Sequence, residues 1–271
     1  MNLKVLFMCG MVALFGSCAS DDPENCPEVS TTPKEVNFRI NKELATRAGK
    51  TEFAEGDAIG IFAVVRTDEE TVALPGATGN QAHNVKYVKT ETGWEAADIE
   101  EKIVWPQNGE ALDFYAYWPY SEDAVDPEAI VFALSDRAES DVLRAANTKG
   151  LTEGEVELSF SHVFAMLEVE VVGEESSADL ELTVKATNVL KQAKWNIGTD
   201  AFEFTEEIGG VMQLTRTDES KWIYQTILLP QTIVSGNEFI QCVYDDTYTY
   251  KAGQDIVFEA GKKQGMKITL K

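Results

Sequence analysis

Histidine and cysteine are scarce in this sequence, and their scarcity limits the chemistry that the protein can perform. The 271 residues include 2 histidines and 4 cysteines. His83 and His162 do not stand at metal-ligand spacing from each other or from a cysteine, so neither a zinc site nor a catalytic histidine is expected. The sequence also lacks a G-x-S-x-G segment, a phosphate-binding glycine loop and an H-E-x-x-H motif. No carboxylate pair stands out as glycosidase-like. We therefore expect no enzyme, no cofactor and no metal.

Basic residues are also few. There are 23 lysines and arginines against 46 aspartates and glutamates, which gives a formal net charge of −23 and a pI near 4.4. This charge opposes binding to nucleic acids and to anionic membrane surfaces, because both would repel the chain. The chain is nevertheless 44% hydrophobic and contains 13 Phe, 5 Trp and 8 Tyr. These residues are sufficient for hydrophobic cores, so a folded protein without a nucleic-acid partner is predicted.

The first 22 residues indicate the compartment. Lys4 precedes an apolar run at residues 5–15 that is too short to span a bilayer. Small residues then precede Cys18, a pattern that resembles the bacterial lipoprotein signal. That resemblance implies a signal peptide at residues 1–17, a lipid on Cys18 and, from the acidic residues that follow, export to the outer face of the outer membrane. An ordinary cleaved signal peptide with an incidental cysteine is the alternative.

Residues 18–35 are rich in proline and polar side chains and are predicted to be a flexible tether. Cys9 leaves with the signal peptide and Cys18 carries lipid, so only Cys26 and Cys242 remain for a disulfide. Cys26 lies in the tether, whereas Cys242 has the position of an inward strand residue. Whether the two pair is left open.

The first strand is predicted at residues 36–40, where apolar and polar side chains alternate with the period of a half-buried strand. Its inward side chains are Val36, Phe38 and Ile40. Residues 41–52 return to small and polar side chains around Arg47, which predicts an exposed loop that a protease can enter.

Short alternating segments continue to the end of the chain at roughly ten-residue spacing, with almost no helical periodicity. An all-β fold is therefore predicted. Residues 121–155 are acidic and are expected to be loop-like, with at most a short helical turn near residues 141–146. This long loop favours two β-sandwich domains in tandem, at residues 36–160 and 161–271.

Aromatic residues gather in the strand at residues 112–118. Tyr115 and Tyr117 share one face with Asp113, while Trp118 belongs to the opposite face. These three aromatic side chains are candidates for stacking on sugar rings of a host or bacterial surface ligand. The alternative is that they form core contacts or cross-strand pairs.

Several segments together resemble the fimbrillin-like proteins of Gram-negative gut and oral anaerobes. The resemblance runs over most of the mature chain, and its segments are the lipoprotein signal, the Arg47 loop, FAEGDAIGIF at residues 53–62, WP at 105–106, LDFYAYWPY at 112–120, DVLRAANT at 141–148 and LSFSHVFAMLEVEV at 158–171.

This resemblance implies a subunit of a type V pilus with two transthyretin-like domains. In that family an arginine-directed protease cuts the loop after the first strand, and the matching position is Arg47, with Ala48 as the new N-terminus. Loss of the first strand would expose an apolar groove and unpaired backbone groups, which a strand of a neighbouring subunit could fill. Repetition of this contact from subunit to subunit would build a filament.

The candidate donor strand lies at the C-terminus, where three apolar residues alternate with polar ones: Met266, Ile268 and Leu270. They could equally form the last strand of the second domain, which would suit a tip or accessory subunit that accepts a strand without donating one. A permanently lipidated surface protein that binds glycans or host ligands is the second functional hypothesis.

Overall fold

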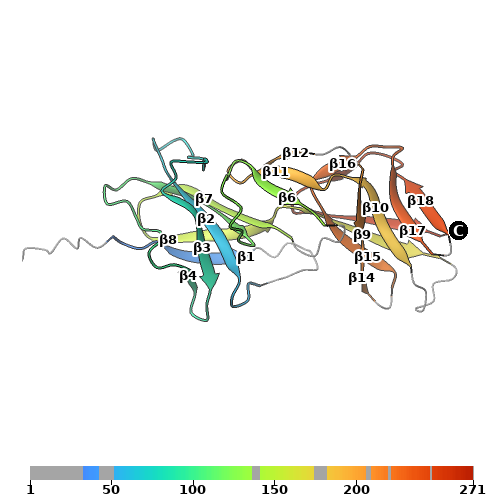
Figure 1. Ribbon diagram of the computed structural model, residues 1–271, viewed down its shortest axis with the longest axis horizontal. Helices are drawn as coiled ribbons and strands as arrows, with labels where there is room; N and C mark the ends of the chain where they lie inside the picture. The colour runs from blue at the N-terminus through green and yellow to red at the C-terminus, as the bar shows by residue number, and fades with distance from the viewer. Residues whose placement is uncertain are drawn as a thin grey trace, which may run out of the picture. The chain divides into compact units, whose positions relative to one another are not determined.

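The computed structural model describes residues 33–42, 52–135, 141–173, 182–205, 209–218, 221–244 and 246–270 (Figure 1). Within these ranges the chain forms 20 β-strands and no helix, so the predicted all-β fold is confirmed. It follows that the same residues contain no apolar helix long enough to cross a membrane. The described residues belong to one compact unit, Pro33–Lys271.

The larger sheet is built from strands in the first part of the chain. Its seven strands are, in sheet order, β1 (Asn37–Lys42), β8 (Glu155–His162), β7 (Leu143–Leu151), β5 (Leu112–Trp118), β2 (Ala58–Val65), β3 (Ala82–Lys89) and β4 (Trp94–Ala96). The pairs of this sheet are antiparallel except for β1 with β8, which is parallel.

The remaining strands form four smaller sheets. One four-stranded sheet has the order β13 (Gly210–Gln213), β10 (Thr183–Val189), β17 (Glu238–Val243), β18 (Thr247–Lys251). A second four-stranded sheet has the order β14 (Thr215–Asp218), β15 (Ile223–Leu228), β9 (Ala165–Val172), β20 (Lys263–Thr269). The other two are β12 (Ala201–Phe204), β11 (Gln192–Asn196), β6 (Ile130–Ala133) and the pair β16 (Gln231–Ile233), β19 (Ile256–Phe258).

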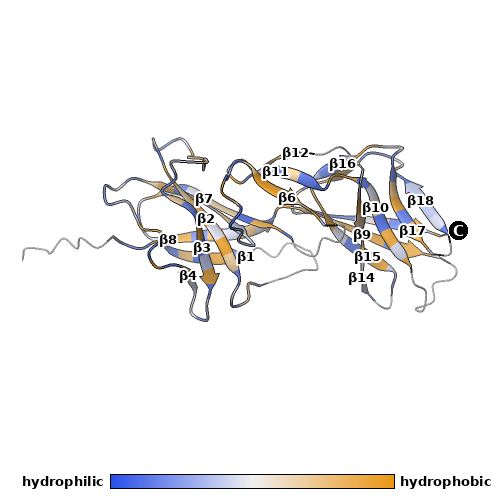
Figure 2. Ribbon diagram, in the orientation of Figure 1, coloured by the Kyte–Doolittle hydropathy of each residue, from blue (hydrophilic) through white to orange (hydrophobic). Residues whose placement is uncertain are grey.

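Alternation along the strands creates the buried faces. In β8 every second side chain is buried, from Val156 through Leu158 to Phe160, while the intervening side chains are exposed. Many other strands also carry both hydrophobic and hydrophilic residues along their length (Figure 2). This is the pattern of a strand with one face in a core and the other toward water.

The buried side chains form three clusters. The N-terminal core contains residues from Val36 to Phe160, and the C-terminal core contains residues from Ala165 to Ile268. A middle core combines side chains from both parts of the chain, among them Tyr115 and Trp195. Only residues 163 and 164 separate β8 from β9, so the chain passes from one large core to the other close to the predicted domain boundary.

The structure corrects the expectation of a loop at residues 121–155. This segment contains β6 and all of β7, and it ends where β8 begins; β7 pairs with β5 from Leu143 to Leu151. Ala145 and Ala146, with their high helix propensity, suggested a helical turn. Pairing with a buried strand overrides that local preference, because β-strand formation depends mainly on tertiary context.

A buried ion pair fixes the loop that follows β2. The guanidinium Nε of Arg66 donates a hydrogen bond of 2.8 Å to Oδ2 of Asp113, a side chain that is fully buried in β5. The same carboxylate accepts hydrogen bonds from the backbone N–H groups of Ala73 at 2.9 Å and Gly150 at 3.0 Å. Asp113 therefore ties both the loop after β2 and the end of β7 to β5.

Replacement of Asp113 by Ala should markedly lower the melting temperature of the protein. It would leave a buried cation and two backbone donors without their acceptor, so we expect the melting temperature to fall by about 6–12 °C. Circular dichroism melting of Asp113→Ala measures this, with Glu110→Ala, an exposed position just before β5, as a control. Equal melting temperatures for the two variants would contradict the structural role of Asp113.

Cys242 lies on β17 with its side chain in the C-terminal core and no measurable exposure. Burial raises the pKa of its thiol to about 11, because the charged thiolate is poorly solvated there. Cys26, its possible disulfide partner, lies outside the described residues.

Cys242 should resist alkylation in the folded protein. With the thiol both buried and protonated at neutral pH, we expect less than about a tenth of Cys242 to react with iodoacetamide in the time that labels it fully in 6 M guanidinium. Peptide mapping by mass spectrometry distinguishes Cys242 from the other cysteines. Rapid labelling under native conditions would show that β17 is not buried as described, and protection that persists after unfolding but disappears on reduction would reveal a disulfide.

Candidate functional site

The first strand lies at an edge of the seven-stranded sheet, as the displaced-strand prediction requires. β1 pairs in parallel with β8 over six positions, from Asn37 opposite Glu155 to Lys42 opposite Phe160. The residues just before it pair on the other side, where the N–H of Val36 donates to the carbonyl of Ile103 at 2.9 Å. The start of the strand thus has partners on both sides, and its later part has β8 alone in the sheet.

The three predicted inward side chains of the first strand reach the N-terminal core. Val36 is 1% exposed, while Phe38 and Ile40 are partly buried against the same core. The Phe38 ring makes edge-to-face contacts with Tyr87 and Phe114, with centroid distances of 5.0 and 5.7 Å. Apolar burial and aromatic contact therefore hold this strand in addition to its backbone hydrogen bonds.

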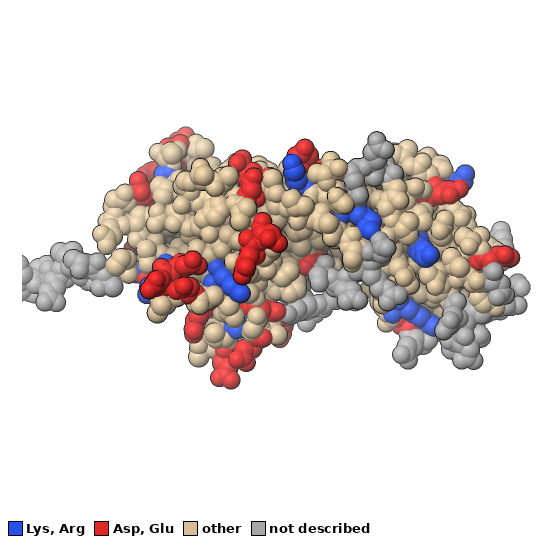
Figure 3. Space-filling view, viewed as in Figure 1, with Lys and Arg blue, Asp and Glu red and all other residues tan. Residues whose placement is uncertain are grey.

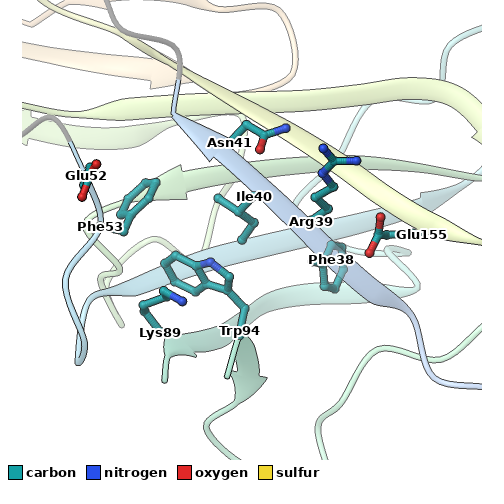
Figure 4. Close-up of a pocket in the computed structure, with 10 residues that line it drawn as sticks. Phe38, Arg39, Ile40, Asn41, Glu52, Phe53, Lys89, Trp94 and Glu155 are labelled. Atoms are coloured by element: carbon teal, nitrogen blue, oxygen red, sulfur yellow. The ribbon is translucent and has the colours of Figure 1, made fainter. Parts of the chain in front are cut away.

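A cavity of about 530 Å³ lies beside β1 (Figure 4). Phe38 and Ile40 from β1 line it together with Phe53 and Trp94 from the opposite side. Charged side chains stand around these apolar groups, and they are Arg39, Glu52, Lys89 and Glu155. The cavity shows that β1 does not fill the space between β8 and β4 completely.

Phe53 anchors the chain where the described residues resume after β1. Its ring makes edge-to-face contacts with Trp94, Trp118 and Phe160, at centroid distances of 5.2, 6.2 and 5.4 Å. The turn that follows is tied to β3, since the N–H of Gly56 donates to the carbonyl of Lys89 at 2.9 Å. Phe53 is thus held by the domain through contacts that do not include β1.

Other predicted site residues lie outside the described ranges. They are the lipid-attachment residue Cys18 and the processing residues Arg47 and Ala48. Their predictions therefore stay predictions.

The C-terminal segment forms β20, which pairs in parallel with β9 at an edge of its sheet. Ile268 is buried in the C-terminal core, and Met266 and Leu270 pack against that core. Lys263 and Lys267 on the other face form ion pairs with Glu168 at 3.1 Å and Glu170 at 3.2 Å. This segment therefore occupies a strand position in its own chain.

The proposed ligand aromatics are not presented to solvent. Tyr115 and Tyr117 are 1% and 2% exposed, and burial raises the pKa of each to about 12. Their hydroxyls donate internally, from Tyr115 to the carbonyl of Ala73 at 2.9 Å and from Tyr117 to Oδ1 of Asn84 at 2.8 Å. Trp118 is partly buried beside Phe53. The middle core covers the face of β5 that carries Tyr115 and Tyr117, so the alternative of core contacts holds for these two side chains and not the ligand-stacking hypothesis.

Sequence reasoning missed the surroundings of the first strand. Trp94 and Lys89 come from the β3–β4 hairpin, far from β1 in the sequence, and no local pattern connects them with it. Glu155 and Glu157 were signalled only indirectly, by the alternation that places the odd-numbered residues of β8 toward solvent. The parallel direction of β1 also had no sequence signal.

Known proteins share this architecture. A family model described as fimbrillin-like matches residues 46–271. A relative named "Putative fimbrium subunit Fim1C", from Bacteroides uniformis, is 27% identical over 248 residues, which cover 86% of this chain and 77% of that protein.

Two crystal structures of proteins titled "putative cell adhesion protein" have the same fold. The one from Bacteroides uniformis has a TM-score of 0.66 at 23% identity, covering 88% of this chain and 93% of the other. The one from Bacteroides ovatus has a TM-score of 0.65 at 19% identity, with coverages of 88% and 92%. With the family model matching most of its length, this chain belongs to the fimbrillin-like family.

Proposed function

We propose that this protein is a fimbrial subunit that accepts a strand from a neighbouring subunit in place of its own β1. In this proposal it is exported as a lipoprotein through Cys18, reaches the outer face of the outer membrane and is cut after Arg47. Membership of the fimbrillin-like family supports a location at the cell surface and assembly with other fimbrial subunits.

The observation that carries the proposal is the position of β1. It is an edge strand whose apolar side chains enter the N-terminal core, and it is followed directly by the segment that contains Arg47. A cut after Arg47 would separate β1 from the rest of the domain covalently while leaving Phe53 on the domain. The family model matches residues 46–271, a range that begins after β1.

Departure of β1 would create a strong binding site for another strand. The backbone of β8 would lose its parallel partner over residues 155–160. Loss of the Phe38 ring would leave an apolar gap beside Tyr87 and Phe114. Unpaired backbone groups and exposed apolar surface are both costly in water. A strand with alternating apolar side chains would restore both kinds of contact.

The same chain suits the accepting role better than the donating role. β20 already fills a position beside β9, where Ile268 is 4% exposed in the C-terminal core. Donation of β20 would open that core, whereas acceptance in place of β1 costs nothing there. This supports a tip or accessory subunit. The alternative of a permanently lipidated glycan- or host-ligand-binding protein loses two of its named ligand residues, because Tyr115 and Tyr117 are buried.

Arg47→Ala should block processing. We expect the variant to remain a lipidated precursor that begins at Cys18, whereas the wild-type protein recovered from the cell surface begins at Ala48. Intact mass and N-terminal sequencing distinguish the two forms. Lys50→Ala, in the same loop, serves as the control and should be processed normally, since the expected protease is directed to arginine. Normal assembly of uncut Arg47→Ala would refute the proposal.

Two substitutions on opposite sides of the cut should behave differently. Phe38→Asp places a charge in the N-terminal core and should lower the melting temperature of the precursor by about 5–10 °C. Phe53→Ala removes an aromatic anchor and should lower it by a similar amount.

After cleavage, the Phe38→Asp and wild-type chains have identical sequences from Ala48 onward. Their melting temperatures should then coincide if β1 has left, while Phe53→Ala should still melt lower than wild type. Melting of the processed proteins by differential scanning calorimetry checks this. A persistent difference between processed Phe38→Asp and wild type would show that β1 stays in place.

A further inference from the structure

Acidic side chains line the outer face of the strand that β1 pairs with. Glu155 and Glu157 on β8 are exposed, and Glu153 stands in the turn just before them. Asp and Glu side chains are also numerous on the part of the surface that holds β3, β4 and β8 (Figure 3). The outer face of β8 and the turn before it thus carry a short row of carboxylates, here called the acidic ladder (Glu153, Glu155 and Glu157).

The first strand and the residues just before it place basic and amide groups opposite the acidic ladder. The Nζ of Lys34 lies 3.4 Å from Oε2 of Glu153, and the side-chain amide of Asn41 donates to Oε1 of Glu157 at 2.9 Å. Arg39 stands opposite Glu157 in the parallel register, and it lies at the rim of the cavity with Glu155 (Figure 4). The charge pattern of β1 therefore complements that of β8.

The C-terminal half of the protein repeats the arrangement. β20 pairs in parallel with β9, and its outward lysines, Lys263 and Lys267, bind Glu168 and Glu170. Although burial opposes ionisation of Glu168, the hydrogen bonds from Gln225 and Lys263 outweigh this effect and lower its pKa. In both places a parallel edge strand with an apolar inner face covers an acidic strand. Its outer face carries basic side chains, Arg39 on β1 and Lys263 and Lys267 on β20.

From this repetition we infer that the acidic ladder on β8 selects the strand that replaces β1, favouring a strand of a neighbouring subunit with Lys or Arg on its outer face. The inference rests on the proposed strand exchange and adds the rule by which a partner is chosen. Apolar side chains at alternate positions are common to many strands, so they provide affinity but little discrimination. Charges at the rim raise the association rate of the matching partner and disfavour an acidic one.

The size of the effect follows from the exposure of these groups. Ion pairs at the surface are individually weak and are screened by salt. The three carboxylates of the acidic ladder, acting together, should favour a basic strand over an acidic one by about tenfold at low ionic strength. Because the ladder is exposed, its removal should leave the fold intact.

The test uses the full chain with a sequence-specific protease site introduced between β1 and Phe53, so that β1 can be released by a single cut. Two fluorescent peptides serve as probes. The basic probe has the sequence of residues 263–271, and the acidic probe carries Lys263→Glu, Lys267→Glu and Lys271→Glu. Binding rates and affinities for the cut protein are measured by anisotropy at 20 mM and 500 mM salt.

We expect the basic probe to bind the cut wild-type protein about tenfold better at low salt and at most twofold better at high salt. The variant Glu153→Gln, Glu155→Gln, Glu157→Gln should lose the preference at both salt concentrations. Its control, Glu91→Gln, Glu100→Gln, Glu110→Gln, changes the net charge equally at exposed positions away from β8 and should keep the preference. Circular dichroism melting verifies that both variants are folded.

The outcomes separate the two proposals. Equal binding of both probes to wild type, or a preference that survives in the ladder variant, would overturn charge selection and leave strand exchange standing. Loss of the preference in the control variant as well would show that only total charge matters, which also overturns it. Failure of both probes to bind any cut protein would overturn the strand-exchange proposal itself.

Discussion

The parallel pairing of β1 with β8 is the contact on which the rest of this structure depends. This pairing covers one edge of the N-terminal core, because it places Val36 and Phe38 against that core. The strand is bound by backbone pairing with β8 over six positions and by a few apolar contacts. Because it is the edge strand, its removal would leave the other strands of the sheet paired. A contact of this kind is strong while the strand is attached to the domain. In the proposed exchange, a cut in the attachment would remove the entropic advantage of the tethered strand and let another strand compete for its place.

The sequence predicted the first strand well because its signal is local. Alternation of Val36, Phe38 and Ile40 with polar residues identifies a half-buried strand without any knowledge of its neighbours. The same holds for β8, where alternate burial of Val156, Leu158 and Phe160 follows the apolar pattern. The predictions of processing at Arg47 and of lipidation at Cys18 rest on sequence motifs, and both residues lie outside the described ranges.

The parts that the sequence did not predict depend on distant contacts. The alternation along β5 left open whether the face that carries Tyr115 and Tyr117 meets a ligand or a core. The middle core covers that face with residues from later in the chain, such as Trp195. β7 was missed for a related reason, since its alanines and charged residues form a strand only because β5 pairs with them. The cavity beside β1 also joins residues from separate hairpins, which no local pattern could connect.

The direct passage from β8 to β9 has a mechanical consequence. Two residues separate these strands, and each carries a parallel partner at the sheet edge, β1 on one and β20 on the other. A tensile force applied along a strand docked on β8 would load its hydrogen bonds in shear, so that all six positions resist together. The covalent chain would then transmit the force straight into β9 and the C-terminal core. A fibre that must withstand flow at a cell surface would gain strength from this short load path.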